Sequence, residues 1–367
     1  MKRAFTHDTP ATRVLFGNGV RGRAADEADR LGASRVLVVA GPSHAALAGE
    51  VEGCLGRRVV GRYRDVVMHV PVEAAAKAVA MAHAVGADGV LAIGGGSAVG
   101  FAKAIAKESG LPIMAIPTTY AGSEMTSIWG LTEKGRKTTG RDELVLPRTV
   151  LYDPELTVNL PAALSAASGM NALAHLVEGL YAPEASPLLA LTAEEGVRAL
   201  ASALPRVVAD GADLEARADA LYGAWLGGWI LGTTTMGVHH KVCHTLGGTW
   251  NLPHAGTHSA VISYAVAFNR DAAPEAMAAL VRALNAGGVP CTDAAEGLWD
   301  LAQRIGAPTS ITDLGFSPAD IDRAATIVVD GRPTNPRMVD HAGIRALIAG
   351  ACDGARPVPP TAATPDT

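Results

Sequence analysis

The first half of the chain alternates short apolar runs with longer alanine-rich stretches. The apolar runs cover residues 35–40, 90–93, 112–116 and 149–152, and each stops at a turn-forming residue. Runs that are apolar on both faces are typical of parallel strands covered by helices. Alanine-rich stretches such as residues 73–85 suit the crossover helices between such strands. The pattern therefore predicts an α/β domain with a doubly wound, mostly parallel sheet.

The second half shows few strand signals. From about Pro161 onward it carries segments rich in alanine and leucine, at residues 165–180, 188–203, 215–231 and 274–284. These segments predict an all-α domain. We expect an α/β domain over residues 1–158, a helical domain over 159–354 and a disordered, proline-containing tail over 355–367.

Composition narrows the class of protein. The chain has 367 residues, 49% apolar and 18% charged, which fits about two folded domains and excludes a disordered chain. The net charge is −5 and there is no long basic run, so we expect no nucleic-acid partner. The four cysteines lie far apart without a CxxC pair, which argues against a disulfide scaffold or a thiolate zinc site.

Neither a secretory signal nor a membrane span is expected. No apolar stretch follows the charged N-terminus. The longest apolar region, residues 221–238, is interrupted by glycines and threonines, which indicates a buried helix rather than a membrane-spanning one. We therefore expect a cytoplasmic enzyme with no membrane partner.

A glycine-rich loop follows one of the predicted strands. Residues 94–97 read Gly-Gly-Gly-Ser and precede a predicted helix over 98–108. Glycines let the backbone approach a pyrophosphate, and a helix N-terminus offers free N–H groups to it. The loop is neither a GxGxxG fingerprint nor a P-loop, so a plain strand-to-helix turn is the alternative. Thr118 and Thr119 follow the next strand at its ligand-binding end, and there the alternative is an ordinary polar loop.

Histidines gather in the second half of the chain. Asn171 and His175 are four residues apart, as are His240 and His244, so each pair shares one face of a helix. Within twenty residues lie five histidines, with Lys241 among them: His239, His240, His244, His254 and His258. We expect the second of these helices to end at Gly247-Gly248, before His254. Histidines at i and i+4 have metal-ligand spacing, although single buried or surface histidines are the alternative.

Seven motifs resemble, in order and spacing over residues 10–345, those of the iron-containing alcohol dehydrogenases. They are residues 94–97, 117–119, 122–124, 152–154, Asn171 with His175, His240 with His244, and 251–254. The resemblance implies a dehydroquinate synthase-like architecture, with a dinucleotide-binding α/β domain, a helical catalytic domain and the active site between them. It implies NADH or NADPH as cofactor, bound by Gly94, Gly95, Gly96, Ser97, Lys103, Thr118, Thr119 and Ser123.

Two departures from that family change the expected chemistry. The family's metal site is one Asp and three His, whereas the matching positions here are Asn171, His175, His240 and His254. The family's usual Asp in the helix after the glycine loop is replaced by Gly100. Both departures resemble the maleylacetate reductase branch, as do residues 120–124, 137–142, 145–148 and 239–248. That branch reduces the carbon–carbon double bond of maleylacetate to 3-oxoadipate in the breakdown of aromatic compounds.

The residues agree with such a reaction. Three imidazoles and an amide give a metal no anionic ligand, so we expect no metal. Hydride addition beside a conjugated ketone leaves an enolate, which imidazole or ammonium donors can hold, and histidine is the natural proton donor. We expect the catalytic residues to be His175, His240, His244, His254, Asn171 and Lys241.

Substrate and cofactor partners can also be anticipated. The substrate is expected to be a small dicarboxylate, so we expect cations in the cleft. The candidates are Lys241, Arg136, Lys137 and Arg141. In the alternative, Arg136, Lys137 and Arg141 belong to a solvated surface loop. No carboxylate follows the strand 36–40 until Glu50, so Gly41 and Ser43 are expected at the adenosine ribose, and both cofactors are expected to work. A homodimer is expected from the resemblance. The alternatives are a metal-dependent alcohol or polyol dehydrogenase and a non-catalytic nucleotide-binding protein.

Overall fold

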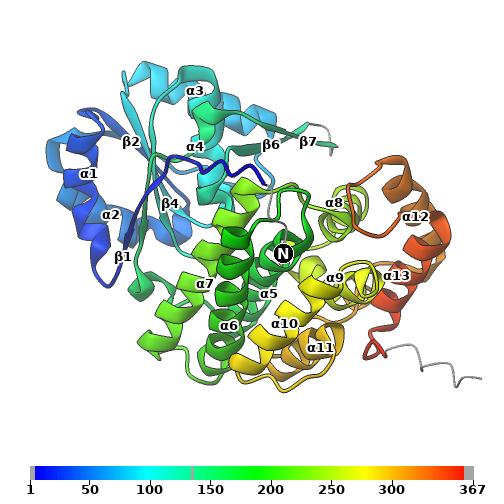
Figure 1. Cartoon of the computed structure of the whole chain (residues 1–367). Helices are drawn as coiled ribbons and strands as arrows, with labels where there is room; N and C mark the ends of the chain where they lie inside the picture. The colour runs from blue at the N-terminus through cyan, green and yellow to red at the C-terminus, as the bar shows by residue number, and fades with distance from the viewer. Residues whose placement is uncertain (1–4, 134–135, 359–367) are drawn as a thin grey trace, which may run out of the picture.

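The computed structural model describes residues 5–133 and 136–358, without the side chains of Arg136 and Lys137. An α/β part is formed by the N-terminal residues and a helical part by the remainder (Figure 1). The last strand of the main sheet ends at Tyr152, and the first long helix begins at Ala162. The predicted division at residue 158 falls between these two elements.

The main sheet has six parallel strands in the order β1-β8-β5-β4-β2-β3. Its strands are β1 (Arg13–Phe16), β2 (Val36–Ala40), β3 (Val59–Tyr63), β4 (Gly89–Gly94), β5 (Ile113–Pro117) and β8 (Thr149–Tyr152). The predicted doubly wound sheet is confirmed, and the four predicted runs are β2, β4, β5 and β8. The prediction missed β1 and β3, which lie at the two edges, where partial exposure removes the continuous apolar run of a central strand.

Helices cover both faces of this sheet. The helices are α1 (Ala24–Arg30), α2 (Ala45–Leu55), α3 (Val72–Ala84) and α4 (Gly96–Ser109). In β2, Val36 and Val38 pack with residues of α1 and α2, whereas Leu37 and Val39 pack with residues of α3 and α4. This alternation is the period-2 geometry of a strand buried on both faces.

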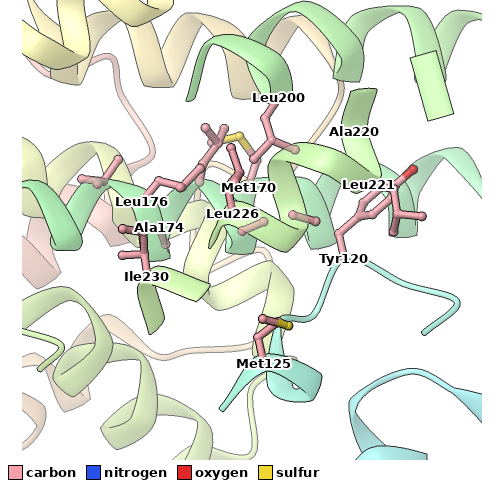
Figure 2. Packing of buried hydrophobic residues seen from close by; sticks show 14 of the residues in the cluster. Tyr120, Met125, Met170, Ala174, Leu176, Leu200, Ala220, Leu221, Leu226 and Ile230 are labelled. Atoms are coloured by element: carbon pink, nitrogen blue, oxygen red, sulfur yellow. The ribbon is translucent and has the colours of Figure 1, made fainter. Parts of the chain in front are cut away.

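The helical part is built from nine helices among the described residues. They are α5 (Ala162–Tyr181), α6 (Pro187–Ala209), α7 (Leu214–Thr233), α8 (Val238–Trp250), α9 (His254–Asn269), α10 (Pro274–Ala286), α11 (Ala294–Arg304), α12 (Ile321–Asp330) and α13 (His341–Asp353). The predicted all-α half is therefore confirmed. Tyr120 and Met125, from the chain after β5, pack into the same apolar core as Met170 of α5 and Leu221 of α7 (Figure 2). The loop that follows β5 is thus fixed against the helical part.

Two segments differ from expectation or extend it. Residues 136–141, for which a solvated loop was the alternative reading, form β7 (Arg136–Arg141), which pairs with β6 (Ile128–Glu133) in a separate antiparallel hairpin. The predicted end of α8 at Gly247-Gly248 is wrong, because the helix continues to Trp250 and ends at Asn251, which adopts a φ of 57°. Packing against α9 and α12 outweighs the helix cost of about 1 kcal/mol per glycine.

The beginning of the predicted tail is attached to the helical part. Arg356 forms ion pairs with Asp300 and Glu296 of α11, and the hydroxyl of Tyr264 donates to the carbonyl of Ala355. The rest of the predicted tail, residues 359–367, lies outside the described residues. No helix in residues 5–133 or 136–358 is both long and apolar enough to cross a membrane.

Candidate active site

The glycine-rich loop joins β4 to α4. Gly94 has a φ of 140°, which side-chain-bearing residues rarely adopt, and a Cβ on Gly95 would lie 3.0 Å from the side chain of Thr119. Gly95 is the N-cap of α4 and no side chain caps that helix end. The first N–H groups of α4, including that of Ser97, are therefore available to an anion. This is the geometry expected of a pyrophosphate site.

The ends of β2 and β5 lie on either side of this loop. The chain winds from β2 outward to β3 and then returns to β4 on the other side of β2, so the switch point of the sheet lies between β2 and β4. Ligands of open α/β sheets bind at such switch points. Gly41 and Ser43 follow β2, and His44 shares a hydrogen bond with the hydroxyl of Thr118 across 3.0 Å. The structure thus places Gly41, Ser43, the glycine-rich loop and Thr118 together at the carboxyl end of the sheet.

Lys103 is a buried residue of α4, the helix that follows the glycine-rich loop. Its ammonium donates to the backbone carbonyls of Thr126 and Ile128, each at 2.7 Å, and to the hydroxyl of Thr126. Burial lowers the pKa of Lys103 to about 7, although the nearby carboxylate of Glu124 opposes the shift. In this arrangement Lys103 braces the chain between β5 and β6, and its expected position near the ribose stays a prediction.

The loop after β5 brings the nucleotide side to the histidines. Gly122 approaches Gly228 of α7 so closely that a Cβ on Gly122 would lie 3.0 Å from the Gly228 Cα. The same Cβ would lie 3.4 Å from the ring of His175. Ser123, the next residue, begins a short 3-10 helix over Ser123–Met125. The predicted cofactor loop and the histidine group are therefore in contact.

Three helices supply the histidine group. Asn171 and His175 come from α5, His239, His240 and His244 from α8, and His254 and His258 from α9. His258 lies at the centre, with its ring centroid 4.5 Å from that of His254, 4.7 Å from His240 and 4.9 Å from His239. The rings of His175 and His240 are 5.2 Å apart. We call these six histidines and Asn171 the histidine cluster.

The cluster runs from the surface into the core. His244 and His254 are exposed and their rings stack at 6.2 Å. The other five members are at most 4% exposed: Asn171, His175, His239, His240 and His258. Burial lowers the pKa of His239 to about 3 and those of His175, His240 and His258 well below the usual range. The buried imidazoles are therefore neutral at pH 7, and solvent meets the cluster at His244 and His254.

Glu178 fixes the position of one buried imidazole. It follows His175 on α5 by three residues and is fully buried. Its carboxylate accepts a hydrogen bond from His240 Nδ1 at 2.6 Å, and others from the backbone N–H groups of Gly237, His239 and His240. Burial raises the pKa of Glu178, while these donors oppose the shift. Glu178 thus caps the N-terminus of α8 and orients the Nε2 atom of His240 away from itself.

Several buried polar atoms of the cluster have no hydrogen-bond partner among the described residues. They are Asn171 Oδ1, His175 Nδ1, His239 Nδ1, His240 Nε2 and both ring nitrogens of His258. Because His240 Nδ1 donates to Glu178, its Nε2 atom carries a lone pair. His239 Nε2 faces the carbonyl oxygen of His258, which leaves the lone pair on His239 Nδ1. Such uncompensated acceptors in a core are costly unless a donor or cation meets them.

These atoms form a donor set that fits a divalent cation. One ring nitrogen from each of His239, His240 and His258 lies within 4.8 Å of the others. Neutral imidazoles whose second nitrogen bonds a carboxylate or carbonyl are typical metal ligands. The group differs from the expected set of Asn171, His175, His240 and His254, since it includes His239 and His258. The expectation of a metal-free protein stays a prediction, and this donor set weighs against it.

Sequence reasoning counted His239 and His258 among the five neighbouring histidines without giving them a role, and it missed Glu178. His258 follows His254 at the same i, i+4 spacing as the other pairs, which was the available signal. His239 and Glu178 carry no comparable pattern, and their roles depend on how α5, α8 and α9 pack.

Some predicted residues lie elsewhere. The aliphatic chain of Lys241 lies against Gly331 at the end of α12, where a Cβ would be 2.0 Å from Lys241 Cε. Arg141 donates to the carbonyl oxygens of Gly232 and Thr234 at the end of α7. The side chains of Arg136 and Lys137 lie outside what the structure describes. The predicted substrate-binding cations are thus not brought together at the cluster by the part of the chain that the structure describes.

Comparison with protein families decides the membership of the chain. Residues 11–154 match the family described as iron-containing alcohol dehydrogenase, and residues 165–352 match the C-terminal part of the Fe-containing alcohol dehydrogenase family. This chain belongs to the iron-containing alcohol dehydrogenase family. It is therefore an NAD(P)H-dependent oxidoreductase, as the resemblance of its motifs implied.

Curated relatives and solved structures agree with this membership. The maleylacetate reductases of Burkholderia cepacia and Sphingobium indicum are each 49% identical over 354 residues, covering 96% of this chain and 99% of each relative. The crystal structure of maleylacetate reductase from Rhizobium sp. strain MTP-10005 has a TM-score of 0.92 and 44% identity, covering 97% of this chain and 100% of that one. An iron-containing alcohol dehydrogenase from Corynebacterium glutamicum is also 44% identical, with a TM-score of 0.91 and coverage of 96% and 98%.

Proposed function

We propose that this family member is a maleylacetate reductase, which reduces the carbon–carbon double bond of maleylacetate to 3-oxoadipate with NADH or NADPH. The supporting observation is the contact between the loop that follows β5, on the predicted cofactor side, and the histidine cluster, through Gly122 and His175. The near-full-length similarity to curated maleylacetate reductases supports the choice of substrate.

The chain's own residues supply binding and proton chemistry. When bound, the reduced nicotinamide supplies the hydride. In this proposal the N–H groups of His175 and His258, whose ring nitrogens include buried atoms without a partner among the described residues, stabilise the negative charge that develops on the ketone oxygen of the substrate. His244 and His254 meet solvent, so they are the proton source for the substrate carbon. The N-terminus of α9 has no side-chain cap and begins at His254, so its N–H groups suit a substrate carboxylate.

A divalent cation, when bound by His239, His240 and His258, would polarise a carbonyl oxygen as a Lewis acid. Conjugate reduction does not require it, because imidazole N–H groups can hold the enolate. We therefore propose that turnover proceeds without a metal. A metal-dependent alcohol dehydrogenase is the second candidate, favoured by the same donor set.

The test compares the two reactions on one preparation. Purified protein is given maleylacetate with NADH or NADPH, and loss of absorbance at the reduced nicotinamide band is followed together with formation of 3-oxoadipate by mass spectrometry. Oxidation of small alcohols and polyols with NAD⁺ is measured before and after addition of Fe²⁺ or Zn²⁺. Maleylacetate reduction supports the proposal, whereas alcohol oxidation alone would replace it with the second candidate.

A homodimer and a cytoplasmic location complete the proposal. Light scattering coupled to size-exclusion chromatography tests the first, and fractionation of the source cells tests the second.

A further inference from the structure

A cavity of about 430 Å³ lies at the carboxyl ends of β2 and β3. Its lining residues are Ala40, Gly41, Pro42, Ala45, Arg62 and Arg64. Because β2 pairs with β4, this cavity adjoins the strand that ends at the glycine-rich loop. An adenosine ribose is bound at this place in doubly wound dinucleotide domains. The cavity therefore belongs to the ribose end of a bound dinucleotide.

Two arginines reach this cavity from the next strand. In the parallel register Val38 pairs with Arg62 and Val39 with Tyr63, so Arg64 follows beyond the last paired residue. Tyr63 points into the core beside Phe101. Side chains alternate along a strand, so Arg62 points to the opposite face, where it bonds Glu52 of α2, and Arg64 lines the same cavity. The sheet thus places two guanidinium groups on one side of the cavity.

The two arginines differ in their charge balance. Arg62 forms an ion pair with Glu52 and donates to the carbonyl of Ala45, so its charge is largely compensated. Arg64 is exposed, and its side chain has no hydrogen-bond or ion-pair partner anywhere in residues 5–133 or 136–358. None of the six lining residues is acidic. The cavity consequently carries one uncompensated positive charge.

Gly41 stands where an acidic residue would exclude a phosphate. In NAD-selective domains a carboxylate after this strand bonds the ribose 2′-hydroxyl and repels a 2′-phosphate. A Cβ on Gly41 would be 3.5 Å from Val66 Cβ, which is ordinary contact, so the space beside the strand end is not blocked. The cavity therefore lacks a carboxylate that would repel a 2′-phosphate, and it carries the positive charge of Arg64, which would attract one.

We propose that Arg64, with Arg62 beside it, binds the 2′-phosphate of NADPH and makes this protein favour the phosphorylated cofactor. The guanidinium of Arg64 forms a charge-assisted hydrogen bond to the phosphate, which is stronger than a bond to a neutral hydroxyl. This inference rests on the proposed function only in assuming a dinucleotide cofactor. It goes further by naming the residue that discriminates between the two cofactors.

The experiment measures dissociation constants of NADPH and NADH without substrate, by quenching of protein fluorescence, in the full chain. Arg64→Gln is expected to weaken NADPH binding about tenfold and to change NADH binding less than twofold. The matched control is Arg57→Gln, since Arg57 is an exposed arginine of the same domain and does not line the cavity. Displacement by 2′,5′-ADP and by 5′-ADP provides a second probe that needs no turnover.

The outcomes separate this inference from the proposed function. Equal weakening of both cofactors, or none, in Arg64→Gln overturns the role of Arg64 while leaving maleylacetate reduction intact. A wild type that binds NADH much more tightly than NADPH also overturns it. Failure of the wild type to bind either dinucleotide overturns the proposed function together with this inference. Selective loss of NADPH and 2′,5′-ADP binding supports it.

Discussion

Replacing Glu178 with Gln changes one oxygen of a buried carboxylate into an NH₂ group. The carboxylate accepts from His239 N at 2.8 Å through Oε1, and through Oε2 from Gly237 N at 3.0 Å and His240 Nδ1 at 2.6 Å. A glutamine in its better orientation keeps the acceptor at the Oε2 position. It then turns its NH₂ group toward the N–H of His239, where two donors face each other.

The magnitude follows from those contacts. One buried donor without an acceptor costs about 1–3 kcal/mol, and loss of a carboxylate at a helix N-terminus costs about 1 kcal/mol more. We expect Glu178→Gln to lower the free energy of unfolding by about 2–4 kcal/mol. Glu178 also holds the ring of His240, which lies 4.7 Å from the ring of His258, so its loss is expected to shift His258 and to lower kcat at least about tenfold.

The assay is urea unfolding followed by tryptophan fluorescence, with kcat for maleylacetate measured on the same protein. Glu184→Gln is the matched control. Glu184 accepts hydrogen bonds from the N–H and hydroxyl of Thr235, which lies in the α7–α8 connection as Gly237 does, but Glu184 is only partly buried. Water can replace those bonds, so the control is expected to cost less than about 1 kcal/mol. Equal urea midpoints for the two variants would refute the argument that Glu178 holds the start of α8.

Four further predictions concern the same sites. Chelation is expected to leave maleylacetate reduction unchanged; activity lost on chelation and regained with Fe²⁺ or Zn²⁺ would contradict this. Asn171→Asp is expected to raise the amount of Zn²⁺ that the protein retains, measured by elemental analysis, because it provides an anionic ligand. His254→Ala is expected to lower kcat about 10²-fold with an unchanged dissociation constant for NADH, as a proton donor would; a normal kcat would assign it to packing. Gly41→Asp is expected to shift the ratio of kcat/KM values toward NADH, by repulsion of the 2′-phosphate; an unchanged ratio would place the adenosine ribose elsewhere. Burial lowers the pKa of His239 from 6.5 to about 3, so below pH 6.5 the unfolded chain binds a proton that the folded chain does not. Metal-free protein is therefore expected to lose stability as the pH falls from 6.5 toward 3; urea midpoints at pH 7 and pH 5 that differ no less in His239→Gln would contradict it.

Much of the fold and part of the site follow from local patterns. The central strands β2, β4 and β5 are buried on both faces, so their apolar runs are visible in the sequence. The pairs Asn171–His175 and His240–His244 follow from the 3.6-residue period of a helix, which fixes faces whatever surrounds them. The family resemblance came from short motifs of the same local kind.

Other features depend on packing between distant segments. Glu178 meets His240 across a separation of 62 residues, and His258 becomes the centre of the cluster only because α9 packs on α5 and α8. Arg64 reaches the end of β2 through the pairing of β2 with β3, an edge strand without an apolar signature. A periodic pattern tells which side of an element is apolar, but not which polar groups of other elements will face it. Residue spacing therefore determined the elements and their faces, and the packing of those elements decided which buried acceptors share one site.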